Sequence, residues 1–284
     1  MRFEKWQALG NDYIVLEREA LPFELTAERV RAICEPHFGC HSDGVLLLSE
    51  SRDPACVADL RIFNPDGSEA ELSGNGAREA ILYLRRSGWT ERDEFTIATA
   101  AGAITPEIIG ADAARVAMAP ARTASADYPG GAADGRGLID VGGTSREFQH
   151  VAVGNPQCAI EVSGGLEDLD LAAVGPPIES SPMFPNRTNV SFWRGEGSTV
   201  RARIFERGVG ETLSSGTGAT GAAVAAHLRG TQSPITVVLD GGELLVEIGP
   251  ELEIWLTGRA EPVFAGEFSP ELMRRLEALG PDPG

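Results

Sequence analysis

The sequence predicts a protein of mixed α and β structure built from two similar halves, rich in strands and poor in helices. Three observations lead to this fold class. The chain has 284 residues, a length that suits one large domain or two of ordinary size. Apolar residues make up 42% and charged residues 23%, an ordinary globular balance. A segment of the second half also repeats a segment of the first, at an offset of half the chain.

The charge balance excludes one class of partner. The chain carries 24 Lys and Arg against 42 Asp and Glu, a net charge of −18, whereas a nucleic-acid-binding protein needs a basic surface. The first residues, MRFEKWQALG, lack the apolar core of a signal peptide. No apolar run approaches the ~18 residues of a membrane span. We therefore expect a cytoplasmic protein without nucleic-acid or membrane partners.

The first half alternates strand and helix patterns. A turn at Gly10-Asn11-Asp12 joins the first two strands as a hairpin. One helix begins at Thr26, and apolar residues at helical spacing predict another over 75–87. Strands are expected at 2–8, 12–17, 45–49, 58–63, 94–99, 102–109 and 114–119.

The second half follows the same style after segment 124–137, which is an exposed loop or part of a domain junction. Strands are expected at 137–141, 146–153, 157–163, 189–194, 199–206, 235–239, 244–248 and 252–257, with helices at 166–173, 216–229 and 269–279. We predict an N-terminal domain over 1–125 and a C-terminal domain over 126–270. The remaining residues, 271–284, form a C-terminal helix that returns to the body and a loose PDPG tail.

The repeat supports duplication. IFNPDGSEAELSGNGAREA at 62–80 aligns without gaps to IFERGVGETLSSGTGATGA at 204–222, with an offset of 142 and eight of nineteen positions identical. An earlier pair, LGNDYIVLE from Leu9 and VGNPQCAIEV from Val153, has an offset of 144. Chance similarity between glycine-rich loops is the alternative. The ungapped match at half the chain length favours two homologous halves.

Both copies contain the same local device. A strand ends, an acidic turn follows, and Ser-Gly-x-Gly at 73–76 and 215–218 opens a helix. The first amides of a helix lack intrahelical acceptors, and small residues let a ligand approach them. The helix dipole adds positive potential, so each turn suits an anion. Two such turns holding one carboxylate would favour chemistry at its α-carbon.

Several motifs closely resemble those of diaminopimelate epimerases. They are GND at 10–12, NPDGSEAELSGNGAR at 64–78, GNP at 154–156, TNV at 188–190 and ERGVGETLSSGTGA at 206–219. The resemblance covers nearly the whole chain. It implies two pseudo-symmetric α/β (α+β) domains, each a strand-rich barrel or roll around a central helix, with substrate in the cleft between them. It also implies no cofactor, neither metal nor pyridoxal phosphate, and a homodimer.

The resemblance further implies an activity and a set of substrate ligands. The activity is cofactor-independent epimerisation of LL- to meso-diaminopimelate, in lysine and peptidoglycan biosynthesis, by proton transfer at the α-carbon. The substrate is thus an amino acid with two carboxylates, and Arg207 matches the arginine that pairs with the distal one. The expected substrate-binding residues are Asn11, Asn64, Gly74, Asn75, Asn155, Asn189, Glu206, Arg207, Gly216 and Thr217. Taken singly, each asparagine could be a turn residue.

The sequence departs from the family at its catalytic positions. The family uses two thiols, one on each face of the α-carbon, where this chain has Ser73 and Ser215. The histidine expected after GNP is Gln157, and the cysteine expected after SGNGAR is Glu79. None of the four cysteines, Cys34, Cys40, Cys56 and Cys158, falls on a catalytic position.

Serine is a poor substitute for a thiol in this chemistry. A thiol has an ordinary pKa near ~8.5, which a helix N-terminus can lower. An alcohol is far less acidic and needs an adjacent general base. His41 and Glu206 are the candidate helpers.

Three functions are compatible with this pattern. The first is a diaminopimelate epimerase whose serines are tolerated by unusual chemistry or introduced to trap substrate, although the changes at Gln157 and Glu79 point to a natural lineage. The second is a cysteine-less isomerase that moves protons with Glu206, Asp43 or Glu79. The simpler interpretation makes Asp43 a turn residue and Glu79 an exposed helix residue. The third is an amino-acid-binding protein without catalysis.

Among these, we favour an isomerase of the racemase and epimerase type. Its predicted catalytic residues are Ser73, Ser215 and Glu206.

Overall fold

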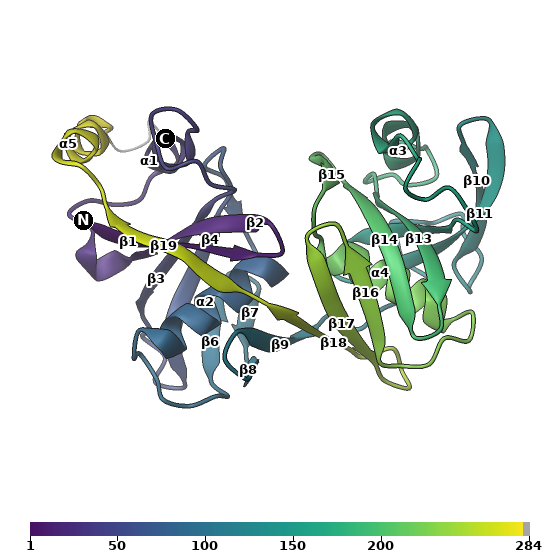
Figure 1. The fold of residues 1–284 in the computed structure, drawn as a ribbon, viewed down its shortest axis with the longest axis horizontal. Helices are drawn as coiled ribbons and strands as arrows, with labels where there is room; N and C mark the ends of the chain where they lie inside the picture. Colours follow the sequence, from purple (N-terminus) through teal and green to yellow (C-terminus); the bar gives the residue numbers. More distant parts are fainter. Residues whose placement is uncertain (281–284) are drawn as a thin grey trace. The chain divides into compact units, whose positions relative to one another are not determined.

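The computed structural model describes residues 1–280, so the predicted loose tail at 281–284 lies outside the described residues. The chain divides into two compact units. Unit 1 comprises Met1–Val116 and Arg259–Gly284, and unit 2 comprises Ala117–Gly258. Each unit is strand-rich with helices, which confirms the predicted class of mixed α and β structure (Figure 1).

Unit 1 is a sheet with helices on both faces. Its sheet has the strand order β19-β1-β2-β3-β4-β6-β7, with β5 paired to β4, while β8 and β9 form a hairpin. The elements are β1 (Arg2–Ala8), β2 (Asn11–Glu17), a 3-10 turn (Arg18–Ala20), α1 (Ala27–Cys34), β3 (Val45–Glu50), β4 (Cys56–Phe63), β5 (Glu69–Ala70), α2 (Gly74–Arg86), β6 (Thr96–Thr99), β7 (Gly102–Ile104), β8 (Glu107–Ile109), β9 (Ala113–Met118), β19 (Glu261–Glu267) and α5 (Pro270–Ala278).

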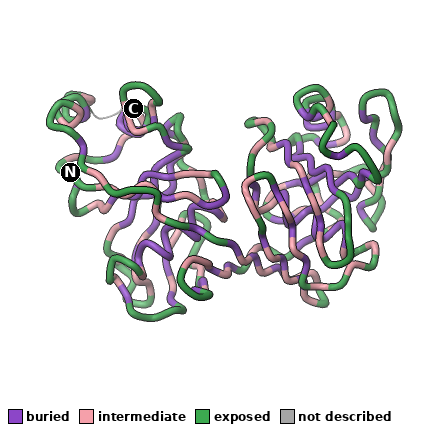
Figure 2. Tube along the Cα trace, viewed as in Figure 1, coloured by how far each residue is buried: buried purple, intermediate pink, exposed green. Residues whose placement is uncertain are grey.

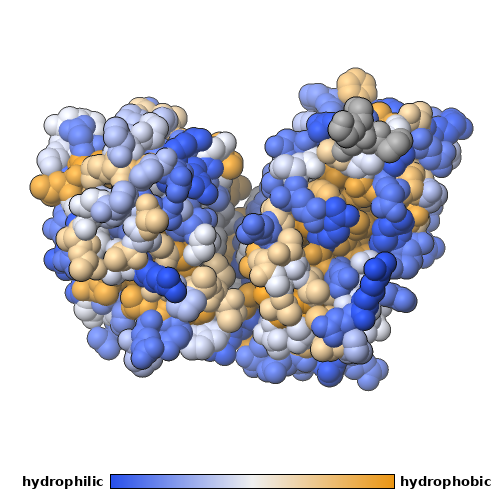
Figure 3. Space-filling view, turned by 180° about the vertical axis from the view of Figure 1, so that it is seen from behind, coloured by the Kyte–Doolittle hydropathy of each residue, from blue (hydrophilic) through white to orange (hydrophobic). Residues whose placement is uncertain are grey.

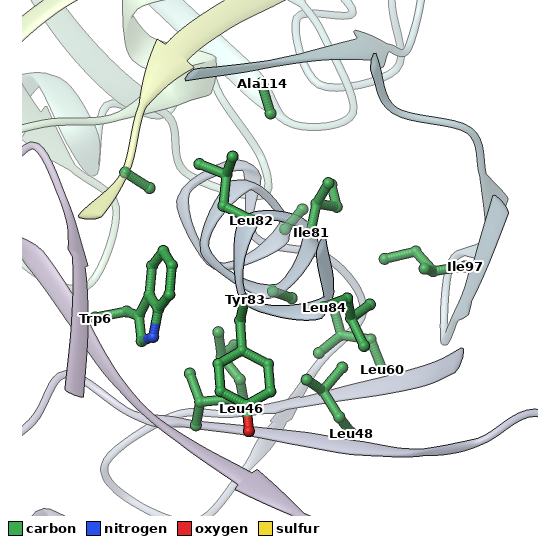
Figure 4. Close-up of a cluster of buried hydrophobic side chains, with 14 of the residues drawn as sticks. Trp6, Leu46, Leu48, Leu60, Ile81, Leu82, Tyr83, Leu84, Ile97 and Ala114 are labelled. Carbon is green, nitrogen blue, oxygen red and sulfur yellow. The ribbon is translucent and has the colours of Figure 1, made fainter. Parts of the chain in front are cut away.

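Helix α2 lies in the core of unit 1. Strand residues have side chains on alternating faces, so β1 to β4 present one set of side chains to α2. Figure 4 shows this cluster gathered around the helix. Its members include Trp6, Val15, Leu46, Leu48, Leu60, Ile81, Leu84 and Ile97. The helix is therefore buried over most of its length, from Asn75 to Leu84 (Figure 2).

The opposite face of the same sheet is covered by α1 and α5. The alternate strand positions point there, so Val45 and Leu47 pack with Val30, Ile33 and Leu276. Coverage of both faces explains why 45–48 is a continuous apolar run rather than an alternating one.

Unit 2 repeats the plan of a sheet around a helix. Its strands follow the order β10-β11-β12-β13-β14-β16-β17-β18, with β15 paired to β14. The elements are β10 (Arg136–Val141), β11 (Thr144–Ala152), β12 (Pro156–Glu161), α3 (Leu171–Glu179), β13 (Asn189–Glu196), β14 (Thr199–Glu206), β15 (Gly210–Thr212), α4 (Gly216–His227), β16 (Ile235–Leu239), β17 (Gly242–Ile248) and β18 (Ile254–Arg259).

Helix α4 occupies the centre of unit 2. It contacts β11, β12, β13, β14, β16 and β17, and every residue from Gly218 to Ala226 is buried. Such close enclosure requires small side chains. A Cβ atom at Gly218 would lie 2.7 Å from Ile204, and one at Gly221 would lie 2.8 Å from Gln157. The alanine- and glycine-rich composition of α4 thus allows the sheet to enclose the helix closely.

Besides the short strands β5 and β15, which the sequence did not predict, the expected elements differ clearly from the observed ones in three places. The helix predicted over 166–173 begins instead at Leu171, because Asp170 accepts a hydrogen bond from the Ala173 amide and caps it. The strand predicted over 102–109 is interrupted at 105–106, where Pro106 has no amide hydrogen to continue a ladder.

The third difference is β19, for which the sequence predicts no strand. It pairs antiparallel with β1, in register Arg2 to Glu267. The residues from Arg259 onward therefore belong to unit 1, whereas the sequence-based division placed 126–270 in the second half.

The surface agrees with the composition. In the view of Figure 3, hydrophilic side chains cover much of each unit, with hydrophobic ones interspersed. Within residues 1–280, no helix combines the length and apolar character that crossing a membrane requires.

The core of unit 2 contains an uncharged histidine. His150 on β11 is 0% exposed, and its Nε2 lies 2.9 Å from the Ser125 hydroxyl. Its ring packs beside those of Tyr128 and Phe184. Burial lowers the pKa of His150, and the charge of Asp127 opposes this in part.

This histidine predicts a loss of stability in mild acid. The unfolded chain protonates His150 near its ordinary pKa of ~6.5, whereas the folded protein resists protonation until lower pH. The free energy of unfolding should therefore fall as pH drops below about 6.5. We expect urea denaturation of His150→Gln between about pH 7.5 and pH 5 to give a shallower fall. The exposed His37→Gln is the control. Parallel curves for all three proteins would contradict the prediction.

Candidate active site

The start of α2 is shaped by Ser73, and we call residues 73–76 the α2 turn. Ser73 has the extended backbone of an N-cap, with φ −124° and ψ 123°, and its Oγ accepts a hydrogen bond from the Gly76 amide. The distance is 3.1 Å. The Tyr13 hydroxyl donates to the same Oγ at 3.3 Å. Serine is a preferred cap, so this predicted catalytic residue also holds the helix end.

A chain of hydrogen bonds connects the α2 turn to the β1–β2 hairpin. The Asn75 amide group donates to Asn11 Oδ1 at 3.2 Å, and the Asn11 amide group donates to Asp43 Oδ2 at 2.9 Å. At the other end, Arg78 donates to Asn75 Oδ1 at 2.5 Å and to the Gly74 carbonyl at 3.0 Å. Two predicted substrate ligands, Asn75 and Asn11, are thereby brought together.

Asn64 lies in the turn between β4 and β5. Its side chain donates to Ser68 Oγ at 2.9 Å, and its carbonyl accepts from the Gly67 amide. In this conformation Asn64 behaves as a turn residue.

Glu79 is not the exposed helix residue that the simpler interpretation expected. It is 0% exposed, because the sheet surrounds α2 and buries positions that would face solvent on an outer helix. Neither carboxyl oxygen has a hydrogen-bond partner among the residues that the structure describes. Burial raises the pKa of Glu79 well above its ordinary range. Asp43, by contrast, is exposed and accepts from the Asp12 amide, as a turn residue would.

The start of α4, residues 215–218, is called the α4 turn and has a carboxylate beside its serine. Ser215 caps the helix by accepting from the Gly218 amide at 3.2 Å. Its hydroxyl also favours the charged form of the nearby Glu206 carboxylate and so lowers the pKa of that group. Thr212 donates to Glu206 Oε1 at 2.8 Å. Ser215 thus has the adjacent base that a serine needs.

The environment of Glu206 makes it a stronger base than an exposed carboxylate. Burial raises its pKa, while the bonds from Thr212 and Ser215 favour the charged form and limit the rise. A carboxylate with a raised pKa accepts a proton more readily and is suited to general acid–base work near neutral pH.

Asn155 and Gln157 form a second hydrogen-bonded arrangement at the α4 turn. The Asn155 amide group donates to Thr217 Oγ1 at 3.2 Å, and Gln157 donates to Asn155 Oδ1 at 2.5 Å. Gln157 is fully buried against Gly221. It therefore fixes the orientation of the Asn155 carboxamide, a task that requires no titration.

Asn189 and Arg207 also lie together. The Arg207 amide donates to Asn189 Oδ1 at 2.8 Å, and the Asn189 amide group donates to the Pro156 carbonyl at 3.1 Å. The Arg207 guanidinium donates to the Asn186 carbonyl at 2.8 Å and is exposed. A guanidinium has five N–H donors, so this contact leaves capacity for a carboxylate.

The two turns are built alike but differ in their titratable groups. In the repeat, Glu206 corresponds to Asn64, since both follow an Ile-Phe pair. Gln157 corresponds to Tyr13. The carboxylate that assists Ser215 therefore has an amide as its counterpart in unit 1.

Two expected sources of chemistry lie elsewhere. His41 is exposed, and its carbonyl accepts a hydrogen bond from Lys5. Cys34 and Cys158 are buried, and burial raises the pKa of the Cys34 thiol to about 12. Within residues 1–280, no group of three or more His, Cys, Asp or Glu could hold a metal ion.

Sequence reasoning missed Tyr13, Arg78 and Thr212. Tyr13 could have been found from its correspondence to Gln157 in the earlier repeat. Arg78 stands in the first turns of a helix, where the helix dipole disfavours a cation. This unfavourable position was the sequence feature by which Arg78 could have been found. No sequence signal pointed to Thr212, because only the β14–β15 pairing brings it to Glu206.

Comparison with known proteins agrees with the motifs. The family model described as diaminopimelate epimerase matches residues 3–124 and 150–263. A diaminopimelate epimerase of Synechococcus sp. (strain JA-3-3Ab) is 39% identical over 278 residues, covering 94% of this chain and 97% of the relative. Diaminopimelate epimerase 2 of Nostoc sp. is 39% identical over 282 residues, covering 96% and 97%.

Solved structures share the fold at low sequence identity. A PhzF-family phenazine biosynthesis protein of Bacillus anthracis has a TM-score of 0.67 at 19% identity, covering 95% of this chain and 99% of that one. A hydroxyproline epimerase of Agrobacterium vitis has a TM-score of 0.63 at 16% identity, covering 96% and 93%. The match of motifs, family model and relatives over nearly the whole length places this chain in the diaminopimelate epimerase family.

Proposed function

We propose that this protein is a cofactor-independent amino-acid isomerase that moves the α-proton of a di-acidic amino acid, with diaminopimelate as the substrate. Membership of the diaminopimelate epimerase family supports the reaction type and the substrate. The observation that carries the proposal is the half-buried Glu206 carboxylate, which Thr212 holds at 2.8 Å and whose pKa the nearby Ser215 hydroxyl lowers. It gives one serine a base of raised pKa, although the thiol is absent.

The same proposal assigns the binding residues. Arg207 takes the distal carboxylate in a bidentate pair, with Asn189 beside it. We assign Asn155 to the same substrate. The Gly216 and Thr217 amides lie in the first turn of α4, where helix amides lack intrahelical acceptors and suit an α-carboxylate. In unit 1, we assign Asn11, Asn64, Gly74 and Asn75 to substrate binding.

The proton transfer needs no free alkoxide. As the α C–H bond breaks, its proton passes to Ser215 Oγ while the hydroxyl proton of Ser215 passes to Glu206. The electron pair left on the α-carbon spreads into the substrate carboxylate, and the helix amides stabilise the growing charge. Reversal of the two transfers returns a proton to the same face and restores the starting configuration, so inversion needs a proton delivered to the opposite face of the α-carbon.

We assign Ser73 a different role from that of Ser215. Its neighbours in hydrogen-bond distance are the Tyr13 hydroxyl and the Gly76 amide, and the unit 1 counterpart of Glu206 is Asn64. We therefore assign Ser73 to hydrogen bonding or proton donation on its side, with Tyr13 behind it, rather than to proton removal.

Replacing Glu206 should abolish proton removal. We expect wild-type protein incubated with LL-diaminopimelate in deuterated water to incorporate α-deuterium, and Glu206→Gln to lose at least about 100-fold in rate, as expected for loss of a general base. Proton NMR or mass spectrometry measures the incorporation. Glu243→Gln, at an exposed position of β17, is the control and should retain the wild-type rate.

The outcome also separates the alternatives. Exchange by the wild type excludes a protein that only binds. If the wild type fails to exchange but gains activity with Ser73→Cys and Ser215→Cys together, the serines are an inactivating change, and the proposal is wrong.

The pH dependence supplies a second test. Proton removal requires ionised Glu206, so the exchange rate should rise with pH through its raised pKa. The Thr212 hydroxyl stabilises the ionised form, and Thr212→Val removes that bond. We expect the acid limb of the profile of kcat/KM against pH to move to higher pH in Thr212→Val. An unmoved limb would show that the titrating group is not Glu206.

A cytoplasmic location, a homodimer and a role in lysine biosynthesis stay predictions from the sequence and the family. Sedimentation of the purified protein would test the homodimer.

A further inference from the structure

Arg78 occupies an unfavourable position that the proposed chemistry does not yet use. Its side chain is 0% exposed, inside the first turns of α2, where both burial and the helix dipole oppose a cation. Its Nε has no hydrogen-bond partner among the described residues. Removing an arginine's charge from water is costly, so a purely structural role would be served better by a neutral residue.

The second half of the molecule contains that neutral solution. Thr220 corresponds to Arg78 in the repeat, and its hydroxyl donates to the Gly216 carbonyl at 2.8 Å. Arg78 makes the equivalent bond to the Gly74 carbonyl. Threonine therefore suffices to tie the helix turn, and the charge of Arg78 must serve another purpose.

The bonds made by Arg78 have a direction. Its guanidinium can only donate, so Asn75 must present its oxygen to Arg78 and its amide group to Asn11. Asn11 then accepts with its oxygen and donates to Asp43. A donor-only group at one end and an acceptor-only carboxylate at the other determine both carboxamide orientations.

We propose that Arg78 is a positioning residue that orients the Asn75 and Asn11 carboxamides and places a buried positive charge beneath the α2 turn, where it strengthens the binding of a substrate carboxylate. The inference rests on the proposed function for the identity of the ligand. The orientation of the two carboxamides does not depend on it.

The charge state fits this role. Burial lowers the pKa of Arg78 only to about 10, so the guanidinium is protonated at neutral pH. Glu79, the adjacent carboxyl, has its pKa raised well above the ordinary range by burial. A carboxyl that resists ionisation cancels less of the arginine charge. Asp12 and Asp43 are the other charged groups that act on Glu79.

The first test uses the ligand-free protein. In NMR spectra of ¹⁵N-labelled protein, Asn11→Ala and Asn75→Ala identify the two side-chain amide signals. We expect Arg78→Met to shift the signals of both asparagines. Arg86→Met, an equal charge loss at the exposed end of the same helix, should shift neither.

If Arg78→Met does not fold, Asn75→Ala decides the same point, since it breaks the chain without removing the charge. It should shift the Asn11 signal. An Asn11 signal that stays unmoved in these variants would overturn the positioning role.

The second test measures affinity for meso-diaminopimelate by calorimetry. We expect Arg78→Met to raise Kd at least about tenfold, which corresponds to about 1.4 kcal/mol. Arg78→Lys keeps the charge and should remain within about threefold of wild type, as should Arg86→Met. Equal losses in the lysine and methionine variants would overturn the electrostatic role.

The two tests separate this inference from the proposed function. A wild-type protein that does not bind diaminopimelate would contradict the proposed substrate, and with it the electrostatic role, while the amide signals would still decide the positioning role of Arg78.

Discussion

The hydrogen bond that the third amide of each helix donates to its cap serine is the interaction on which both turns depend. Ser73 and Ser215 hold the first turns of α2 and α4, which the surrounding sheets bury. The bond orients the first helix amides and places the serine oxygen beside them. Sulfur is a weak acceptor, so a thiol at either position would cap the helix less firmly. The exchange of sulfur for oxygen thus strengthens the fold where it weakens the acid–base group.

In unit 2, a neighbouring carboxylate offsets the low acidity of the serine. Glu206 stands next to Ser215 and is buried enough to be a useful base, whereas the repeat places Asn64 at the corresponding position. Conversely, the buried cation Arg78 lies in unit 1, where unit 2 has Thr220. Duplication produced two similar frameworks, and substitution then placed a half-buried carboxylate beside the cap serine in one and a buried cation in the other.

Much of this architecture could be predicted from the sequence. The repeat led to two units, and periodicity located most strands and the two central helices. The strand β19 was missed because EPVFAGE contains proline and glycine, which an edge strand tolerates but a propensity argument rejects. Its partner β1 lies more than 250 residues away, so no local signal could reveal the pairing.

The residues of the candidate site could be predicted less completely than the fold. Family motifs led to the prediction of the asparagines, Arg207 and both serines, because these residues lie in glycine-rich turns with fixed spacing. The burial of Glu79 was not predictable, since its exposure depends on how far the sheet closes around α2. The pairing of Thr212 with Glu206 likewise required the short β14–β15 contact.

The return of β19 to the first sheet has a consequence for the order of synthesis. Unit 2 is a continuous segment inserted between two parts of unit 1. As the chain leaves the ribosome, residues 117–258 are complete and free to fold as a domain while the sheet of unit 1 still lacks its edge strand. The first-made half is therefore the last to be finished, and until β19 emerges, β1 presents an open edge to which other nascent chains could add.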